Sequence, residues 1–322
     1  MTVPTELFPP IEPYNHGFLP VIGGHEIYYE QCGNPKGFPV FFIHGGPGAG
    51  CDAEDRRFLD PDKYRIILHD QRGCGRSKPF GKLDANNTWA LVDDIRTLRR
   101  ELGIDKFFLF GGSWGSTLSM IYAINYPKTV AGMSLRGIFL ATKKEMDYFY
   151  KDGYKGVGIY IPDQWERYIG NVPAEYRNNP LSYYLQEIRN SNQELARELT
   201  LFECSNLHLV PSTQEELEKD LGTVPAMALL EAHYFTNNCF IEDEYILGNA
   251  DSIAHIPTVI VHGMYDLVCM PLSAKLLNKA LPLSTLYWTV AGHSSRDPET
   301  LKKLVSETDD MFDKINYKED PA

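Results

Sequence analysis

Short apolar runs rich in β-branched and aromatic residues recur along the chain, and such runs predict buried strands. In the first half they cover residues 25–31, 40–43, 64–69, 107–110 and 132–135. Residues 88–102 instead repeat apolar positions at helical spacing, with leucine or isoleucine at 91, 95, 98 and 102. Strands that alternate with amphipathic helices predict an α/β fold, with a mostly parallel sheet flanked by helices.

The pattern changes after Phe139. Residues 141–240 lose the β-branched runs and become helical, aromatic and rich in Glu and Asn, and strand-like runs return afterwards. We therefore expect a sheet domain formed by residues 1–140 and 241–322, interrupted after its sixth strand by an all-helical domain at residues 141–240. The charged tail from Asp309 to Ala322 is expected to be poorly ordered.

The run at residues 107–110 leads into Gly111-Gly112-Ser113-Trp114-Gly115 and then into a helix-compatible segment. Gly-x-Ser-x-Gly between a strand and a helix is typical of a sharp turn that exposes a nucleophilic serine above the sheet. The glycines let neighbouring backbone pack closely, and the helix start offers unpaired N–H groups to a developing negative charge. A glycine-rich connection without chemistry is the competing interpretation, and the flanking strand and helix disfavour it.

A serine nucleophile needs a base, and the base needs an orienting acid. Asp266 and His293 each lie just beyond the carboxyl end of a later predicted strand, where open parallel sheets place their sites. His262 competes as the base, but it lies only four residues before Asp266 at a strand end, so we interpret it as structural. Asp251 and Asp297 compete as the acid less well, because neither directly follows a buried-type strand.

A second glycine cluster, HGGPG at residues 44–48, follows the apolar run at residues 40–43. A histidine and consecutive glycines after a buried strand are typical of a loop that donates one N–H to a tetrahedral oxyanion. We predict that Gly46 supplies this donor and that Trp114 supplies the other, which together stabilise the transition state. His44 is expected to hold the loop rather than to act in catalysis.

Several blocks of the chain together resemble the proline iminopeptidase (prolyl aminopeptidase) family, a serine peptidase branch of the α/β-hydrolases. They are HGGPG (44–48), DQRGCGRS (70–77), GGSWGS (111–116), LRGIF (135–139), VHGMYD (261–266) and AGHS (291–294). The likeness extends from Leu7 to Pro298. It implies an α/β-hydrolase fold with a helical cap and the release of N-terminal proline from peptides, with Ser113, Asp266 and His293 as the catalytic triad.

The resemblance also implies a set of substrate-binding residues. Glu203 and Glu231 match positions that hold the free amine of the substrate, for which charge-assisted hydrogen bonds are suited. Arg136, Phe139 and Cys269 match residues that line the proline pocket. Without the resemblance, we would interpret the two glutamates as ordinary residues of a helix surface. Arg136 would be interpreted as a surface charge and Cys269 as a buried thiol.

Three features depart from the family pattern. The segment between Glu203 and Glu231 is expected to be shorter, Phe149 stands where tyrosine is usual, and Met264 stands where arginine is common. They leave open a broader aminopeptidase or a carboxylesterase with the same triad. A non-catalytic receptor of this fold is disfavoured by the complete triad and the two oxyanion loops.

Composition and charge limit the classes of partner and cofactor that we expect. The 322 residues are 43% hydrophobic, enough for one large core, and the formal net charge of −12 argues against nucleic acid or an anionic membrane as partner. We find no signal-peptide pattern and no 18-residue apolar run. Six scattered cysteines lack metal-ligand spacing, which predicts thiols in a reducing cytoplasm and no metal or other cofactor. Small peptides with N-terminal proline are the expected partners.

Overall fold

The structure, a computed structural model, describes residues 6–213, 217 and 224–316. Its described residues form an eight-stranded sheet in the order β1-β2-β4-β3-β5-β6-β7-β8. The strands are β1 (Asn15–Val21), β2 (His25–Gly33), β3 (Phe38–Ile43), β4 (Tyr64–His69), β5 (Phe107–Gly112), β6 (Val130–Arg136), β7 (Thr258–Gly263) and β8 (Ser284–Thr289). The pairs β1–β2 and β2–β4 are antiparallel and all pairs from β4 to β8 are parallel, which confirms the mostly parallel sheet.

β1 is the strand that the apolar pattern did not predict. Its sequence, NHGFLPV, contains a glycine and a proline, and Leu19 is its one buried residue. The strand pairs with β2 at the edge of the sheet, where proline is tolerated and no continuous apolar run is needed. Such an edge strand lacks the pattern by which buried strands are recognised.

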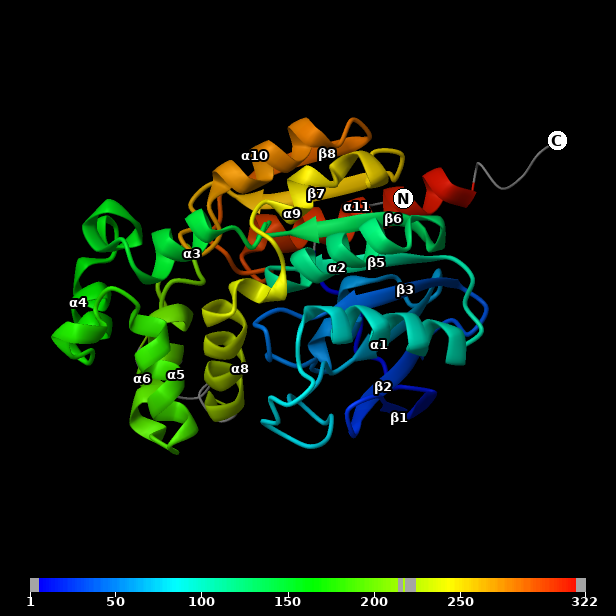
Figure 1. Cartoon of the computed structure of the whole chain (residues 1–322). Helices are drawn as coiled ribbons and strands as arrows, with labels where there is room; N and C mark the ends of the chain where they lie inside the picture. The colour runs from blue at the N-terminus through cyan, green and yellow to red at the C-terminus, as the bar shows by residue number, and fades with distance from the viewer. Residues whose placement is uncertain (1–5, 214–216, 218–223, 317–322) are drawn as a thin grey trace.

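Helices cover both faces of the sheet (Figure 1). Successive residues of a strand point to opposite faces. Phe41 of β3 therefore belongs to one buried cluster, together with residues of α1 (Thr88–Glu101) and α2 (Trp114–Asn125). Phe42 belongs to the cluster on the other face, together with residues of α11 (Pro298–Asn316).

α11 corrects the expectation of a poorly ordered tail. The helix continues to Asn316, and Leu304, Val305 and Met311 are buried in the second cluster. The charged residues that suggested disorder, such as Asp310, lie on the exposed side of an amphipathic helix. Residues 317–322 of the predicted tail lie outside the described residues.

Between β6 and β7 the described residues form helices and no strand. These are α3 (Lys143–Tyr150), α4 (Pro162–Gly170), α5 (Pro180–Arg189), α6 (Gln193–Cys204), α8 (Val224–Thr236) and α9 (Tyr245–Gly248), with short 3-10 turns between them. Most of them stand beside the carboxyl ends of the central strands (Figure 1). The predicted helical insertion after the sixth strand is therefore confirmed. The segment expected to be shortened includes residues 214–216 and 218–223, which lie outside the described residues.

The remaining helix, α10 (Pro271–Ala280), packs against β7 and β8. Among the described residues, no helix combines the length and the apolar character needed to cross a membrane. The same residues contain no group of three or more His, Cys, Asp and Glu side chains placed to hold a metal ion.

Candidate active site

Ser113 occupies a strained turn between β5 and α2. Its φ of 58° and ψ of −127° lie outside the regions that a serine ordinarily adopts, and such strain persists only where the surroundings enforce it. The Ser113 N–H donates to the Arg136 carbonyl at 2.9 Å, and its own carbonyl accepts from Ser116 N–H at 2.8 Å. A Cβ at Gly115 would overlap the Ile43 carbonyl, so the turn requires glycine there. The motif therefore forms the sharp strand-to-helix turn that was predicted for a nucleophilic serine.

Asp266 and His293 form a buried pair beyond β7 and β8. The His293 Nδ1–H donates to Asp266 Oδ2 at 2.8 Å, and Asp266 Oδ1 accepts from the N–H groups of Val268 and Cys269. Burial alone would raise the pKa of Asp266, but the charge and the hydrogen bond of His293 hold it below its ordinary value. Asp266 is therefore an ionised acceptor that fixes the orientation of the His293 ring.

The competing histidine, His262, is fully enclosed. Its Nδ1 accepts from Ile138 N–H at 3.0 Å, and its Nε2 donates to the Cys269 carbonyl at 3.1 Å while lying 3.5 Å from Asp266 Oδ2. Burial lowers its pKa. Because both ring nitrogens are occupied by these contacts, His262 joins the loops around Asp266.

The competing acids have other surroundings. Asp297 accepts from Gly292 N–H at 2.7 Å and from Leu209 N–H at 3.1 Å, and it lies 2.9 Å from His208 Nδ1. It holds the loop before His293 against the chain that follows α6. Asp251 is exposed in a 3-10 turn.

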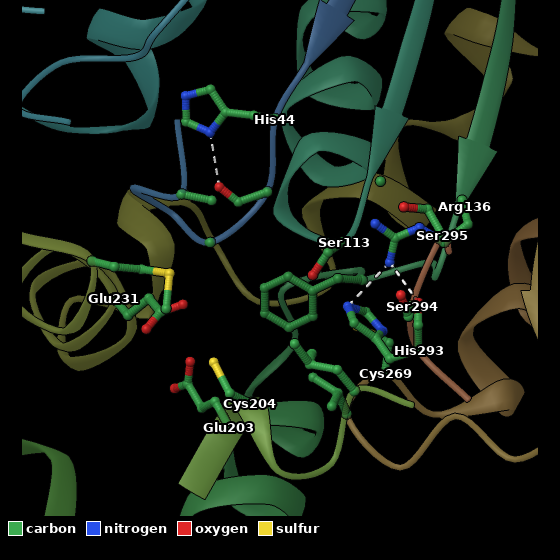
Figure 2. A pocket seen from close by; sticks show the side chains of 18 of the residues that line it. His44, Ser113, Arg136, Glu203, Cys204, Glu231, Cys269, His293, Ser294 and Ser295 are labelled. Atoms are coloured by element: carbon green, nitrogen blue, oxygen red, sulfur yellow. Dashed lines mark hydrogen bonds between the residues drawn. The ribbon is translucent and has the colours of Figure 1, made fainter. Parts of the chain in front are cut away.

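Arg136 lies against the His293 ring, a contact that the sequence did not predict. Its Nη1 lies 3.2 Å from His293 Nε2 and donates to the His293 carbonyl at 2.8 Å (Figure 2). Since the guanidinium can only donate, Nε2 accepts, and the ring proton lies on Nδ1 toward Asp266. In this conformation the Ser113 side chain interacts with the Cys269 thiol. The predicted nucleophile and base thus line one cavity, each with another partner.

Gln71 connects the two loops predicted to form the oxyanion hole. Its backbone N–H donates to His44 Nε2 at 2.9 Å, its side-chain amide donates to the His44 carbonyl at 2.9 Å, and its Oε1 accepts from Trp114 Nε1 at 3.0 Å. Gly46 has a φ of 103°, which favours glycine, and a Cβ there would overlap Gly48 N. Trp114 is the first residue of α2, so its N–H has no partner within the helix. The sequence singled out His44 as the residue that holds this loop but missed Gln71.

Glu203 of α6 and Glu231 of α8 are both buried, and their carboxyl groups face the cavity from the side of the helical insertion (Figure 2). Burial raises the pKa of Glu203, and the hydrogen bonds from Glu231 and Tyr150 offset this rise only in part. Burial and the charge of Glu203 raise the pKa of Glu231 well above its ordinary value. The Tyr150 hydroxyl donates to Glu203 Oε1, and Glu231 Oε2 has no hydrogen-bond partner among the described residues. The pair therefore retains a proton to higher pH than an isolated glutamate.

One cavity of about 440 Å³ contains most of the predicted site residues. Its lining includes Gly46, Ser113, Arg136, Phe139, Glu203, Glu231, Cys269 and His293. Asp266 and Trp114 are buried behind this lining, where Asp266 contacts His293. Tyr150 and Asp55 also line the cavity, and the sequence had given neither a role.

The fold and its matches define the class of protein. A sequence model of the alpha/beta hydrolase fold matches residues 39–294. The crystal structure of proline iminopeptidase from Mycobacterium smegmatis superposes with a TM-score of 0.62 over 95% of this chain and 100% of that one, at 16% identity, which supports the fold alone. An esterase from Exiguobacterium antarcticum gives 0.62 at 17% identity over 94% of this chain and 100% of that one. The chain is an α/β-hydrolase.

Closer relatives identify the branch. The chain is 46% identical to a probable proline iminopeptidase of Leptolyngbya boryana, over 94% of this chain and 96% of the relative. It is 43% identical to a proline iminopeptidase of Arabidopsis thaliana, over 95% of this chain and 82% of the relative. The chain belongs to the proline iminopeptidase family.

Proposed function

We propose that this chain is a serine exopeptidase that releases N-terminal proline from small peptides through an acyl-enzyme. One observation carries the proposal: a single cavity has a nucleophile elbow beside an Asp–His pair at one end and two buried carboxyl groups at the other. The first group is suited to acyl transfer, and the second to binding a cation.

In this mechanism Ser113 attacks the carbonyl of the N-terminal residue while His293 Nε2 takes the serine proton. Asp266 holds the His293 tautomer. The N–H groups of Gly46 and Trp114 stabilise the oxyanion, and His293 then protonates the leaving amine. Water hydrolyses the acyl-enzyme by the same route. Arg136 must first release His293 Nε2.

The two glutamates bind the imino nitrogen of the substrate in this proposal. A protonated proline nitrogen carries two N–H donors, one for each carboxylate of Glu203 and Glu231. Their surroundings are dry, so each charge-assisted hydrogen bond is strong. Phe139, which packs edge-on to Phe235 with ring centroids 5.9 Å apart, and Cys269 form apolar walls for the pyrrolidine ring. A carboxylesterase of this fold would have no use for two buried carboxyl groups beside its acyl pocket.

A panel of arylamides tests the specificity. Pro-arylamide should be cleaved far faster than Ala- or Leu-arylamide, and N-acetyl-Pro-arylamide should resist because it lacks the cation. Glu203→Gln and Glu231→Gln should each lower kcat/KM for Pro-arylamide by about 10- to 1000-fold and leave a simple ester nearly unaffected. Equal cleavage of Pro- and N-acetyl-Pro-arylamide would favour the broader hydrolase.

We further propose that residues 141–240 form a cap over a catalytic domain of residues 1–140 and 241–322, because α6 and α8 supply the two glutamates from that side. A cytoplasmic location is also proposed. It is supported by the scattered spacing of the six cysteines along the sequence, which does not suggest a disulfide framework.

A further inference from the structure

The mechanism fixes where the leaving residue lies. His293 Nε2 gives its proton to the leaving nitrogen, which must therefore come within hydrogen-bond distance of that atom, about 3 Å. The acyl residue extends the other way, toward Glu203 and Glu231. Figure 2 shows Ser294 and Ser295 beyond His293, on the side of the cavity away from the two glutamates. This end of the cavity is the subsite of the leaving residue.

Arg136 is the cation nearest to that subsite. Its Nη1 lies 3.2 Å from His293 Nε2, the atom beside which the leaving nitrogen must lie. The α-carboxylate oxygens of an amino acid lie about 3–3.5 Å from its nitrogen, by ordinary bond lengths. When the leaving residue is also the last residue of the peptide, its free carboxylate therefore falls within reach of the Arg136 guanidinium.

The charge of Arg136 is incompletely compensated. Among the described residues it forms no ion pair within 4 Å, and its buried Nε has no hydrogen-bond partner. Burial lowers its pKa, although the charges of Asp266 and Asp55 oppose this shift, so Arg136 is a desolvated cation with acids nearby but none in direct contact in the described part of the chain. A buried charge without a paired counter-charge is costly, and a planar guanidinium binds a carboxylate with good geometry.

Other charges at this end are already paired or exposed. Arg296 Nη2 lies 3.3 Å from Asp55 Oδ1 and 3.9 Å from Asp52 Oδ1, and Asp55 Oδ2 accepts from Asp52 N–H. Asp52 is largely exposed. Burial and the charge of Asp52 raise the pKa of Asp55 to about 7, so this acid is partly neutral at neutral pH and opposes an incoming carboxylate only in part.

We propose that Arg136 binds the free α-carboxylate of the leaving residue, which makes Pro-X dipeptides the preferred substrate class. The inference rests on the proposed exopeptidase function, because that function places the leaving nitrogen at His293. It also gives Arg136 a second effect. A carboxylate that draws the guanidinium away from His293 Nε2 frees the base for Ser113, so the dipeptide should gain in kcat as well as in KM.

The wild-type enzyme tests this directly with Pro-Ala and Pro-Ala-NH2, which differ in one charge at the same position. We expect kcat/KM for Pro-Ala to exceed that for the amide by at least about 10-fold, with part of the gain in kcat. The tripeptide Pro-Ala-Ala should behave like the amide. A ratio near one overturns the inference while leaving the exopeptidase function intact, because the amide is still cleaved. If no proline peptide is cleaved, the proposed function itself fails.

Substitutions test whether the preference for a free carboxylate depends on the guanidinium of Arg136. Arg136→Gln removes a contact of His293 and should slow the cleavage of both substrates. The readout is therefore the ratio of kcat/KM for Pro-Ala to kcat/KM for Pro-Ala-NH2, which should fall to about one. Arg296→Gln, which removes the other guanidinium at this end, should keep the wild-type ratio. If Arg136→Gln does not fold, Arg136→Lys should still lower the ratio, because lysine lacks the planar fork. An Arg136 variant that keeps the full ratio, or an Arg296 variant that loses it, overturns the assignment.

Discussion

Glu203 and Glu231 place two carboxyl groups in one desolvated space, and this arrangement opposes folding. Burial raises the pKa of both side chains, so their ionised forms are less stable in the folded chain than in water. The Tyr150 hydroxyl offsets part of this at Glu203. At Glu231 the buried Oε2 remains without a partner, so Glu231 is the more costly of the two.

Glu231→Gln should therefore stabilise the free enzyme. An acid whose pKa is raised by folding has no effect on stability below its unfolded pKa, about 4.3, where both states are protonated. As pH rises from there through the raised folded pKa, ionisation favours the unfolded chain and wild-type stability falls. The Tm of Glu231→Gln should exceed that of wild type by a margin that grows between about pH 4.5 and 8, in scanning calorimetry. The exposed Glu194→Gln of α6 is the matched control, and parallel curves for Glu231→Gln and wild type would contradict the prediction.

The protonation of the Glu203–Glu231 pair should also affect substrate binding. A protonated carboxyl pair cannot accept both N–H donors of the cationic imino nitrogen, so lowering the pH should weaken binding. We expect KM for Pro-arylamide to rise as pH falls through the raised pKa of the pair, while KM for an ester without an amine stays level. Steady-state kinetics between about pH 5 and 9 would measure both, and a parallel rise for the two substrates would point to the triad instead.

Ser113→Ala should lower kcat by several orders of magnitude with the fold intact, because it removes the atom that becomes acylated. A serine-directed organophosphorus reagent should label Ser113 in the wild type and nothing in the variant, by peptide mass spectrometry. Circular dichroism checks the fold. Near-full activity of the variant, or labelling at another serine, would refute the assignment.

Residue identity and order were enough to bring Ser113, Asp266 and His293 into one prediction, because each follows a strand whose end lies at a known edge of the sheet. The contacts that surround these residues could not be predicted in this way. Arg136, at the end of β6, meets His293, which lies 157 residues later and follows β8, two strands away in the sheet. Gln71 joins the two segments predicted to form the oxyanion hole through three hydrogen bonds. Such contacts depend on tertiary geometry, which no local pattern encodes.

At the scale of elements, one buried carboxyl group connects α3, the first helix of the insertion, to α10, which packs against the sheet. Glu145 closes a capping box with Thr142 at the start of α3 and accepts from the Leu140 N–H at 3.1 Å. It also accepts from the Ser273 hydroxyl of α10 at 2.5 Å. Four donors thus converge on one side chain where the chain enters the insertion.

Glu145→Ala should destabilise the protein by about 2–4 kcal/mol, because it leaves several buried donors without an acceptor. Thr142→Ala loses the cap alone and should cost about 1 kcal/mol. Urea unfolding monitored by fluorescence measures both, with the exposed Lys144→Ala of the same turn as the control. If Glu145→Ala unfolds at the same urea concentration as Lys144→Ala, the link does not contribute to stability.

Strands and helices were predictable where burial imposes a pattern and unpredictable where it does not. The seven later strands carry apolar runs, whereas β1 has one buried residue and depends on pairing with β2. The distal half of α11 was mistaken for a tail because its charged residues occupy the exposed side. The missed strand and the misjudged helix end both occur where only some positions are buried, so the hydrophobic pattern is weak.

For the whole molecule, the sequence predicted a helical insertion but not how its helices would present two glutamates to Ser113. That placement depends on packing within the insertion. Tyr168 stacks on Tyr184 with ring centroids 5.1 Å apart and on Phe202 at 4.4 Å, which joins α4, α5 and α6. Because Phe202 immediately precedes Glu203, this aromatic stack sets the direction of the glutamate. Aromatic composition indicated a core in the insertion, whereas the partners within it follow only from the folded structure.

The net charge of −12 gives the final prediction, at the scale of the whole chain. The field of the whole molecule is focused in clefts with low-dielectric walls. The lining of this cavity includes the acids Glu203, Glu231 and Asp55 beside the cations Arg136 and Arg296, on a chain whose net charge is strongly negative. A substrate of charge +1 should therefore be concentrated at its mouth, through an attraction that salt screens. The Debye length falls from about 30 Å at 0.01 M to about 3 Å at 1 M.

Over that range kcat/KM for Pro-arylamide should fall by a factor of about 2–10, while kcat/KM for an uncharged ester stays nearly constant. The buried hydrogen bonds to the glutamates are screened much less than the outer field, so activity should level off at high salt and not vanish. Stopped-flow or steady-state assays in sodium chloride at constant pH measure the dependence. Equal losses for both substrates would mean that salt acts on the protein and not on encounter. A rising rate for the cationic substrate would mean that the cations lining the cavity, Arg136 and Arg296, outweigh the acidic surface.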